Sequence, residues 1–131
     1  MILSRMSKAN VEIVGSIYEL TAKRESVKGL VADDLEYVNP PYAVEGGVRR
    51  GRDSLRGVMD IFADFYFDVE RYLEVGDEVV AIGTATGTSP SGLPARWRMG
   101  HIWTIENGKA IRFRWFNDPA EALEAVGLDD D

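Results

Sequence analysis

The chain has a single histidine, His101, in a segment where it could do acid–base chemistry. Residues 100–117 read as two strands joined at Asn107-Gly108, a pair that tolerates the positive φ of a tight hairpin turn. Aromatic neighbours favour the neutral imidazole, which has one donor and one acceptor nitrogen. Such a ring can act as a general base, or it can orient a carbonyl or hydroxyl group.

The length of the hairpin loop decides which side chains share a face with His101. A two-residue loop would pair His101 with Arg114. A three-residue loop ending in a glycine bulge would pair His101 with Phe113 and Trp103 with Ile111. The second register separates apolar from charged residues, so we predict it. One face then carries Trp97, Met99, His101, Trp103, Ile105, Ile111, Phe113, Trp115 and Asn117.

Polar partners for the histidine are expected from outside the hairpin. Tyr18 lies on the apolar stripe of a predicted helix, and Tyr37 and Asn39 have the same parity on a short strand. Pro40 holds the preceding residue extended. Asn39 can bind a ligand or hold the turn, because asparagine commonly bonds its own backbone there. Tyr18 and His101 can equally be core residues that satisfy each other.

Large side chains supply the candidate wall of a cavity. Aromatic residues belong to the core by default, because they dominate the buried area, but a subset can line a pocket for a flat or apolar ligand. The predicted ligand-binding positions are Tyr37, Phe62, Met99, Trp103, Phe113, Trp115 and Asn117. Asp118 is interpreted as a helix cap rather than an acid, because Pro119 and Glu121 complete a capping pattern.

Apolar periodicity predicts the elements that position these residues. Helices are expected over 7–22 with Ser7 as N-cap, over 25–31, and from Asp53 or Ser54 to about residue 65. Strands are expected over 35–39, 67–75, 78–87, 95–105 and 110–117, with a loop over 42–50 and a small final helix ended by Gly127. This order predicts an α+β fold with helices on one face of a curved sheet. Strong curvature would leave a pocket beneath them.

Composition limits the classes of function. A chain of 131 residues without cysteine predicts one domain with no disulfide and no thiolate metal site. The net charge of −7 argues against a nucleic-acid partner. One histidine and no visible carboxylate cluster predict no metal, and nothing in the sequence requires a cofactor. We expect a cytoplasmic protein with no membrane partner, because the apolar runs are short.

Five segments resemble the nuclear transport factor 2-like superfamily, and within it the SnoaL-like proteins and ketosteroid isomerases. They are Leu30–Pro40, Arg50–Leu55, Glu74–Val80, His101–Lys109 and Asn117–Leu128. The resemblance implies a single SnoaL-like domain over 1–131. It also implies a cystatin-like, cone-shaped fold, whose strongly curved mixed or antiparallel sheet has helices packed on its concave face. An apolar pocket and a homodimer are implied as well.

The resemblance also suggests roles for three residues. Tyr18 corresponds to the isomerase oxyanion donor, Asn39 to the catalytic aspartate base, and His101 to the protonated aspartic acid. Asparagine has no usable basicity, so ketosteroid isomerase activity is not expected. The leading hypothesis is a protein that binds a small, largely apolar molecule, with His101 as acid or base in isomerisation, cyclisation or dehydration and with Tyr18 and Asn39 polarising the substrate. The alternative is a non-catalytic ligand-binding or dimeric association module.

Overall fold

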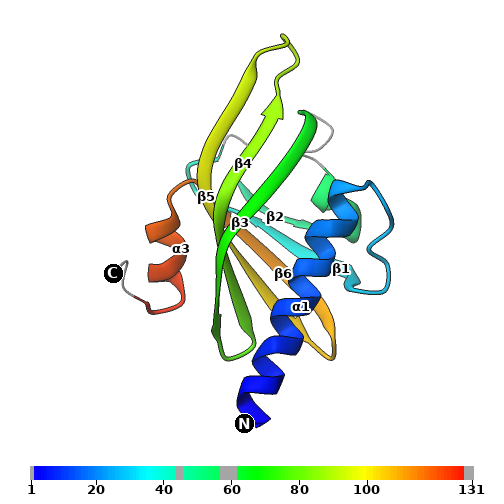
Figure 1. Ribbon diagram of the computed structural model, residues 1–131, viewed down its shortest axis with the longest axis vertical. Helices are drawn as coiled ribbons and strands as arrows, with labels where there is room; N and C mark the ends of the chain where they lie inside the picture. Colours follow the sequence, from blue (N-terminus) through cyan, green and yellow to red (C-terminus); the bar gives the residue numbers. More distant parts are fainter. Residues whose placement is uncertain (1, 44–45, 57–61, 129–131) are drawn as a thin grey trace.

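The computed structural model describes residues 2–43, 46–56 and 62–128, with the side chains of the first helix described from Ala9 onward. The elements are helix α1 (Ile2–Ala22), strands β1 (Val31–Asn39) and β2 (Gly47–Arg50), the 3-10 helix η1 (Arg52–Arg56), strands β3 (Ala63–Val75), β4 (Glu78–Thr88), β5 (Pro94–Glu106) and β6 (Lys109–Phe116), and helix α3 (Pro119–Ala125) (Figure 1).

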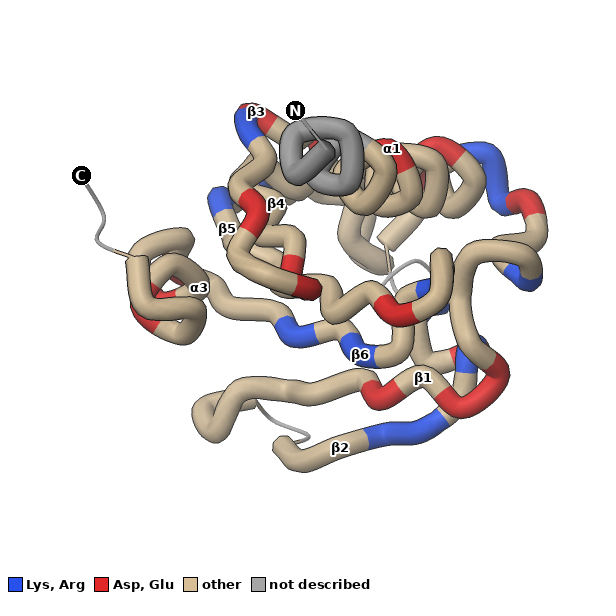
Figure 2. The backbone as a smooth tube through the Cα atoms, turned by 90° about the horizontal axis from the view of Figure 1, so that it is seen from below, with Lys and Arg blue, Asp and Glu red and all other residues tan. Residues whose placement is uncertain are grey.

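One sheet contains all six described strands, in the order β2-β1-β6-β5-β4-β3. Neighbouring strands are antiparallel except β1 and β6, which run parallel. The sheet curves around α1 without closing (Figures 1 and 2). The predicted α+β class with a curved mixed sheet is therefore confirmed.

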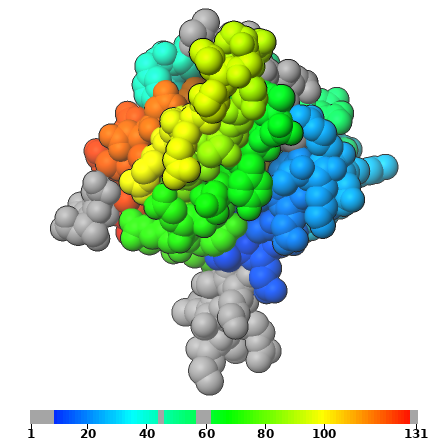
Figure 3. All heavy atoms as spheres, turned by 45° about the horizontal axis from the view of Figure 1, so that its top comes forward, coloured from blue at the N-terminus to red at the C-terminus, as the bar shows by residue number. Residues whose placement is uncertain are grey.

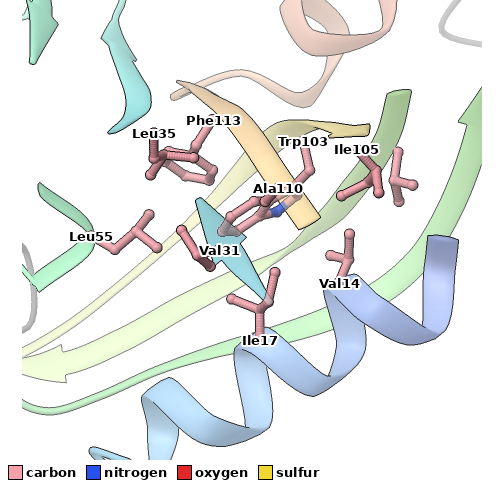
Figure 4. Packing of buried hydrophobic residues seen from close by; sticks show 10 residues of the cluster. Val14, Ile17, Val31, Leu35, Leu55, Trp103, Ile105, Ala110 and Phe113 are labelled. Atoms are coloured by element: carbon pink, nitrogen blue, oxygen red, sulfur yellow. The ribbon is translucent and has the colours of Figure 1, made fainter. Parts of the chain in front are cut away.

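Helix α1 supplies the apolar stripe that covers the inner face of this sheet. Val14 and Ile17 are completely buried and pack against Trp103 (Figure 4). The helix begins at Ile2 and not at Ser7. Neither Pro nor Gly occurs before Gly15, and Leu, Arg and Met favour the helix, so nothing in this stretch ends it at a serine.

Gly15, in the middle of α1, has room for a side chain. A Cβ added there would lie 3.6 Å from the Tyr72 hydroxyl oxygen, an ordinary contact. We expect Gly15→Ala to raise the free energy of unfolding by about 0.5–1 kcal/mol, because alanine loses less backbone entropy in a helix than glycine. Urea unfolding monitored by circular dichroism measures the change. A decrease would show that Tyr72 cannot accept the methyl group.

Two predicted elements near β1 are corrected: residues 25–30 form an irregular segment and a turn instead of a helix, and the described part of the predicted loop over 42–50 includes strand β2. Strand β1 begins at Val31, which pairs with Ala110 of β6, while Val38 pairs with Val48 of β2. Val31 and Leu35 are fully buried. A few apolar residues at helical spacing are a weaker determinant than these long-range contacts.

The predicted helix from residue 53 to about 65 is also too long. The described part contains η1 and then β3, which pairs with β4 from Ala63 onward. Phe65 and Phe67 therefore belong to a strand. Val58 and Met59, two members of the predicted helical stripe, lie outside the described residues.

The hairpin between β5 and β6 has a two-residue turn instead of the predicted three-residue loop. Asn107 and Gly108 have positive φ values of 53° and 78°, as a type I′ turn requires. A register shift then leaves Ile111 as the extra residue of a bulge in β6. Ile105 pairs with Ala110, and Ala110 replaces Ile111 in the buried core cluster.

The bulge gives a register that differs from both of the registers considered above. His101 pairs with Trp115 instead of Phe113 or Arg114, and Trp103 pairs with Phe113. The turn and the bulge together shift the pairing by an even number of residues relative to the predicted register. The aromatic residues therefore still share one face with His101.

The two described α-helices pack on opposite faces of the sheet (Figures 1 and 2). Ala122 and Leu123 of α3 pack against Val80, Ile82 and Ile102, whose side chains point away from α1. The predicted start of α3 is confirmed, because the Asp118 side chain accepts a hydrogen bond from the backbone N–H of Ala120 at 3.0 Å. Neither described helix combines the length and the apolar character that a membrane crossing needs.

Candidate functional site

A cavity of about 300 Å³ lies between α1 and the inner face of the sheet. Helix α1 and strand β3, which lie side by side at the surface (Figure 3), both contribute to its wall. None of its described lining residues is charged. They are Ile17, Tyr18, Thr21, Ala22, Tyr37, Leu55, Phe65, Tyr66, Phe67, Trp97, Met99, His101, Trp103, Phe113, Trp115 and Asn117.

His101 is bonded to the rest of the core through one ring nitrogen. Its Nδ1 lies 2.6 Å from the Tyr18 hydroxyl oxygen, which also accepts a hydrogen bond of 2.8 Å from the indole N–H of Trp103. Phe67 stacks on the imidazole with ring centroids 4.1 Å apart, and Phe113 approaches it at 4.8 Å with its ring steeply inclined. These contacts hold the imidazole in one orientation.

Burial controls the protonation of this group. Desolvation lowers the pKa of His101 from 6.5 to about 3, so the ring is neutral at pH 7. Desolvation also raises the pKa of Tyr18 well above its usual value, an effect that the hydrogen bond from Trp103 only partly offsets. The site thus contains a neutral imidazole and a neutral phenol in an uncharged cavity.

Most of the predicted site residues line this cavity. They are Tyr18, Tyr37, Met99, His101, Trp103, Phe113, Trp115 and Asn117. Tyr37 enters from β1, where its ring lies 5.1 Å from that of Phe113, and burial raises its pKa to about 12. Asn117 follows the end of β6. Helix α1, η1 and strands β1, β3, β5 and β6 thus converge on one volume.

Asn39 and Phe62 are not among the described lining residues. The side-chain oxygen of Asn39 accepts a hydrogen bond of 2.8 Å from the Trp115 indole, and its amide donates to the Gly47 carbonyl at 3.4 Å. Asn39 therefore holds the Trp115 ring and the start of β2 instead of facing the cavity. Phe62 packs against Trp97 with ring centroids 5.4 Å apart.

Phe67 is the most important residue that sequence reasoning missed. It is buried, stacks on His101 and contacts the Tyr18 ring at 5.2 Å. Its signal was the alternation of Phe65, Phe67 and Val69, which has the period of a strand. The predicted helix up to residue 65 hid the first part of that alternation.

Within residues 9–43, 46–56 and 62–128, no group of three or more His, Cys, Asp or Glu side chains could hold a metal ion. The cavity wall itself offers a single imidazole. The sequence prediction that the protein uses no cofactor remains a prediction.

Residues 20–113 match the family model of the SnoaL-like domain. The chain belongs to the SnoaL-like family. This confirms the resemblance drawn from the sequence. The matched range covers the end of α1 and the sheet as far as Phe113 in β6, so it includes most of the cavity wall, and Tyr18 lies just before it.

Solved structures show the same fold as this SnoaL-like chain. A protein of unknown function from Burkholderia pseudomallei, described as nuclear transport factor 2-like, is 28% identical, with 92% of this chain and 98% of that one covered and a TM-score of 0.71. TerC, crystallised with polyporic acid, is 26% identical over 90% and 97% of the chains, with a TM-score of 0.71.

A third structure shares the fold at lower identity. A protein from Jannaschia sp. CCS1 named as a SnoaL-like polyketide cyclase is 18% identical over 91% and 92% of the two chains, with a TM-score of 0.70. A search of curated proteins found no match. The comparisons therefore show the family and the fold, whereas ligand and chemistry depend on the site itself.

Proposed function

We propose that this SnoaL-like protein binds a small, flat, uncharged molecule in the cavity and holds its polar group at His101. The observation that carries this proposal is the contrast between an uncharged, mostly aromatic wall and one buried imidazole. Apolar pockets with a few well-placed polar groups are the usual form of small-molecule sites. TerC, which shares the fold, was crystallised with polyporic acid, and this supports a small-molecule ligand.

The chemistry that fits this site is proton transfer next to a polarised oxygen, as in isomerisation, cyclisation or dehydration. A hydrogen bond from the neutral imidazole would polarise a carbonyl group of the ligand. The aromatic wall excludes water, which strengthens that interaction. Burial makes His101 a weak base, so the imidazole alone would not abstract a proton from carbon. Its role is to donate a hydrogen bond, or a proton that it later takes back, to an oxygen of the ligand.

One observation favours the alternative of a binding protein without turnover. Asn39, at the position that corresponds to the isomerase base, is engaged by Trp115 and the Gly47 carbonyl outside the cavity. No carboxylate is among the described lining residues to replace it. A substrate that requires a strong base would therefore bind and leave unchanged.

Ligand-dependent thermal stability tests the proposal. We expect flat, uncharged carbonyl compounds, 2-acetylnaphthalene among the probes, to raise the melting temperature of the wild type, since binding at a hundred times Kd adds about 2.7 kcal/mol to stability. His101→Phe keeps a ring but removes the hydrogen bond, so affinity should fall roughly tenfold or more. Thr84→Val is the control, because Thr84 is buried and bonds Glu70 but does not line the cavity.

The outcomes separate the parts of the proposal. Stabilisation by charged ligands alone would contradict an uncharged site. Equal affinity in the wild type and His101→Phe would remove His101 from ligand binding. Recovery of a changed compound from wild-type incubations, but not from His101→Phe, would favour catalysis, whereas recovery of unchanged ligand from both would favour the binding module.

The predicted homodimer remains a proposal drawn from the family resemblance. Equilibrium sedimentation of the purified chain tests it. A monomer at micromolar concentration would contradict it.

A further inference from the structure

We propose that the hydrogen bonds joining Trp103, Tyr18 and His101 run in one direction and make His101 a donor to the cavity through Nε2–H. The ligand class is then an aromatic molecule with an acceptor oxygen, such as a ketone, quinone or ether. This deepens the proposed function and rests on it for the ligand. The direction of the hydrogen bonds is a property of the free protein.

The indole of Trp103 fixes the direction of its hydrogen bond to Tyr18. An indole N–H can only donate, so at 2.8 Å the Tyr18 oxygen is the acceptor of this bond. The single phenolic proton of Tyr18 must therefore point elsewhere. The other recorded partner of this hydroxyl within residues 9–43, 46–56 and 62–128 is His101 Nδ1, at 2.6 Å.

The two tautomers of His101 differ in which of these groups is left without a partner. If Nδ1 carried the proton, Tyr18 would accept twice and its own buried proton would have no acceptor among the described residues. An unmet buried donor is costly. If Nδ1 is unprotonated, the Tyr18 hydroxyl donates to it and still accepts from the Trp103 indole, so both of these hydrogen bonds form. The second arrangement places the imidazole proton on Nε2.

The Nε2 edge of His101 is the part of the ring that its neighbours leave uncovered. Phe67 covers one face of the imidazole, Phe113 contacts it with an inclined ring, and Tyr18 occupies Nδ1. The ring nevertheless lines the cavity. Among the described residues, His101 Nε2 is not one of the inaccessible side-chain atoms that lack a hydrogen-bond partner. The edge that carries Nε2 is thus the one open to a ligand.

The role of Tyr18 changes as a result. The family resemblance implied that its hydroxyl donates to the substrate, but here the proton is directed at His101. Tyr18 is therefore a positioning residue that acts through the imidazole. A ligand oxygen meets an N–H donor, while a ligand N–H donor meets another donor and is rejected.

Nitrogen-15 NMR of the free protein tests the direction of the hydrogen bonds. Because the chain has one histidine, a tag-free sample gives one pair of ring signals. We expect Nε2 at the frequency of a protonated ring nitrogen and Nδ1 at that of an unprotonated one. A protonated Nδ1 at pH 7 would overturn the proposal whatever the protein binds.

Two variants test whether Tyr18 sets the tautomer. Tyr18→Phe removes the donor to Nδ1, so the Nδ1–H form should become populated and the two signals should move toward each other. Trp103→Phe removes a hydrogen bond of the same chain but leaves the Tyr18 proton directed at Nδ1, so the tautomer should stay as in the wild type. Unchanged signals in Tyr18→Phe would overturn the positioning role.

Three probes of similar shape test the ligand class. We expect 2-acetylnaphthalene to bind at least fivefold more tightly than 2-ethylnaphthalene, and 2-naphthylamine to bind no better than the hydrocarbon. Tighter binding of the amine would overturn the donor assignment. If none of the three binds while Nε2 carries the proton, the ligand proposal fails and the assigned direction of the hydrogen bonds stands.

Discussion

Lowering the pH from 7 to 3 is expected to cost the folded state roughly 4 kcal/mol through His101 alone, at about 1.4 kcal/mol for each pH unit. Burial lowers the pKa of this histidine from 6.5 to about 3 in the folded protein. Below pH 6.5 the imidazole is protonated in the unfolded chain but stays neutral in the folded chain, so unfolding is favoured. The contribution of His101 is fully retained above pH 6.5 and is lost progressively as the pH falls toward 3.

Urea unfolding of the wild type and His101→Gln over this range measures the effect. Glutamine does not titrate, and its amide can still accept a hydrogen bond from Tyr18. Other groups also respond to acid, since the Arg112 guanidinium lowers the pKa of Glu36 and the stability from that pair is lost on protonation. The difference between the two proteins isolates His101. Parallel curves from pH 7 to pH 4 would show that the imidazole is not desolvated.

Gly83→Ala is expected to destabilise the fold by about 3 kcal/mol or more, which few single substitutions reach. Gly83 lies on β4 opposite Val69 of β3. A Cβ at this position would stand 2.3 Å from the backbone oxygen of Asp68 and 3.0 Å from the Phe67 ring. The backbone cannot rotate away as a side chain can, so the two strands must separate. Because Phe67 stacks on His101, the cavity would be disturbed as well.

Gly29→Ala is the matched control for this substitution. No heavy atom lies within 4 Å of a Cβ built on Gly29, and no left-handed backbone angle is found there. We expect the free energy of unfolding of this variant to stay within about 0.5 kcal/mol of the wild type. Equal stabilities of the Gly83 and Gly29 variants in urea would contradict the close approach of β3 and β4.

Local signals predicted the part of the fold that carries the site. Asn107-Gly108 predicted the turn, because few residues accept two successive positive φ values. Strict alternation in β5 predicted that His101 and Trp103 share a face, and this holds although the register was wrong. Asp118 and Pro119 predicted the start of α3. Each of these signals depends on residues close together in the chain.

Long-range contacts decided what the sequence alone could not. Residues 25–30 form an irregular segment and a turn instead of the predicted helix, and the parallel pairing of β1 with β6 extends the predicted strand back to Val31. The hydrogen bond from the Trp115 indole holds the side chain of Asn39, a predicted catalytic residue, away from the cavity. Helix α3 packs on the outer face of the sheet, where it covers the apolar side chains of Val80, Ile82 and Ile102.

The direction of the hydrogen bonds at His101 also depends on long-range contacts. The sequence by itself determined a single histidine among aromatic residues and, with the family resemblance, a cavity beneath a helix. The tertiary structure brought the Tyr18 hydroxyl to 2.6 Å from Nδ1 and the Trp103 indole to 2.8 Å from that hydroxyl. Alternation reports which face of a strand a residue occupies, but hydrogen bonds over more than eighty residues depend on how helix and sheet pack together.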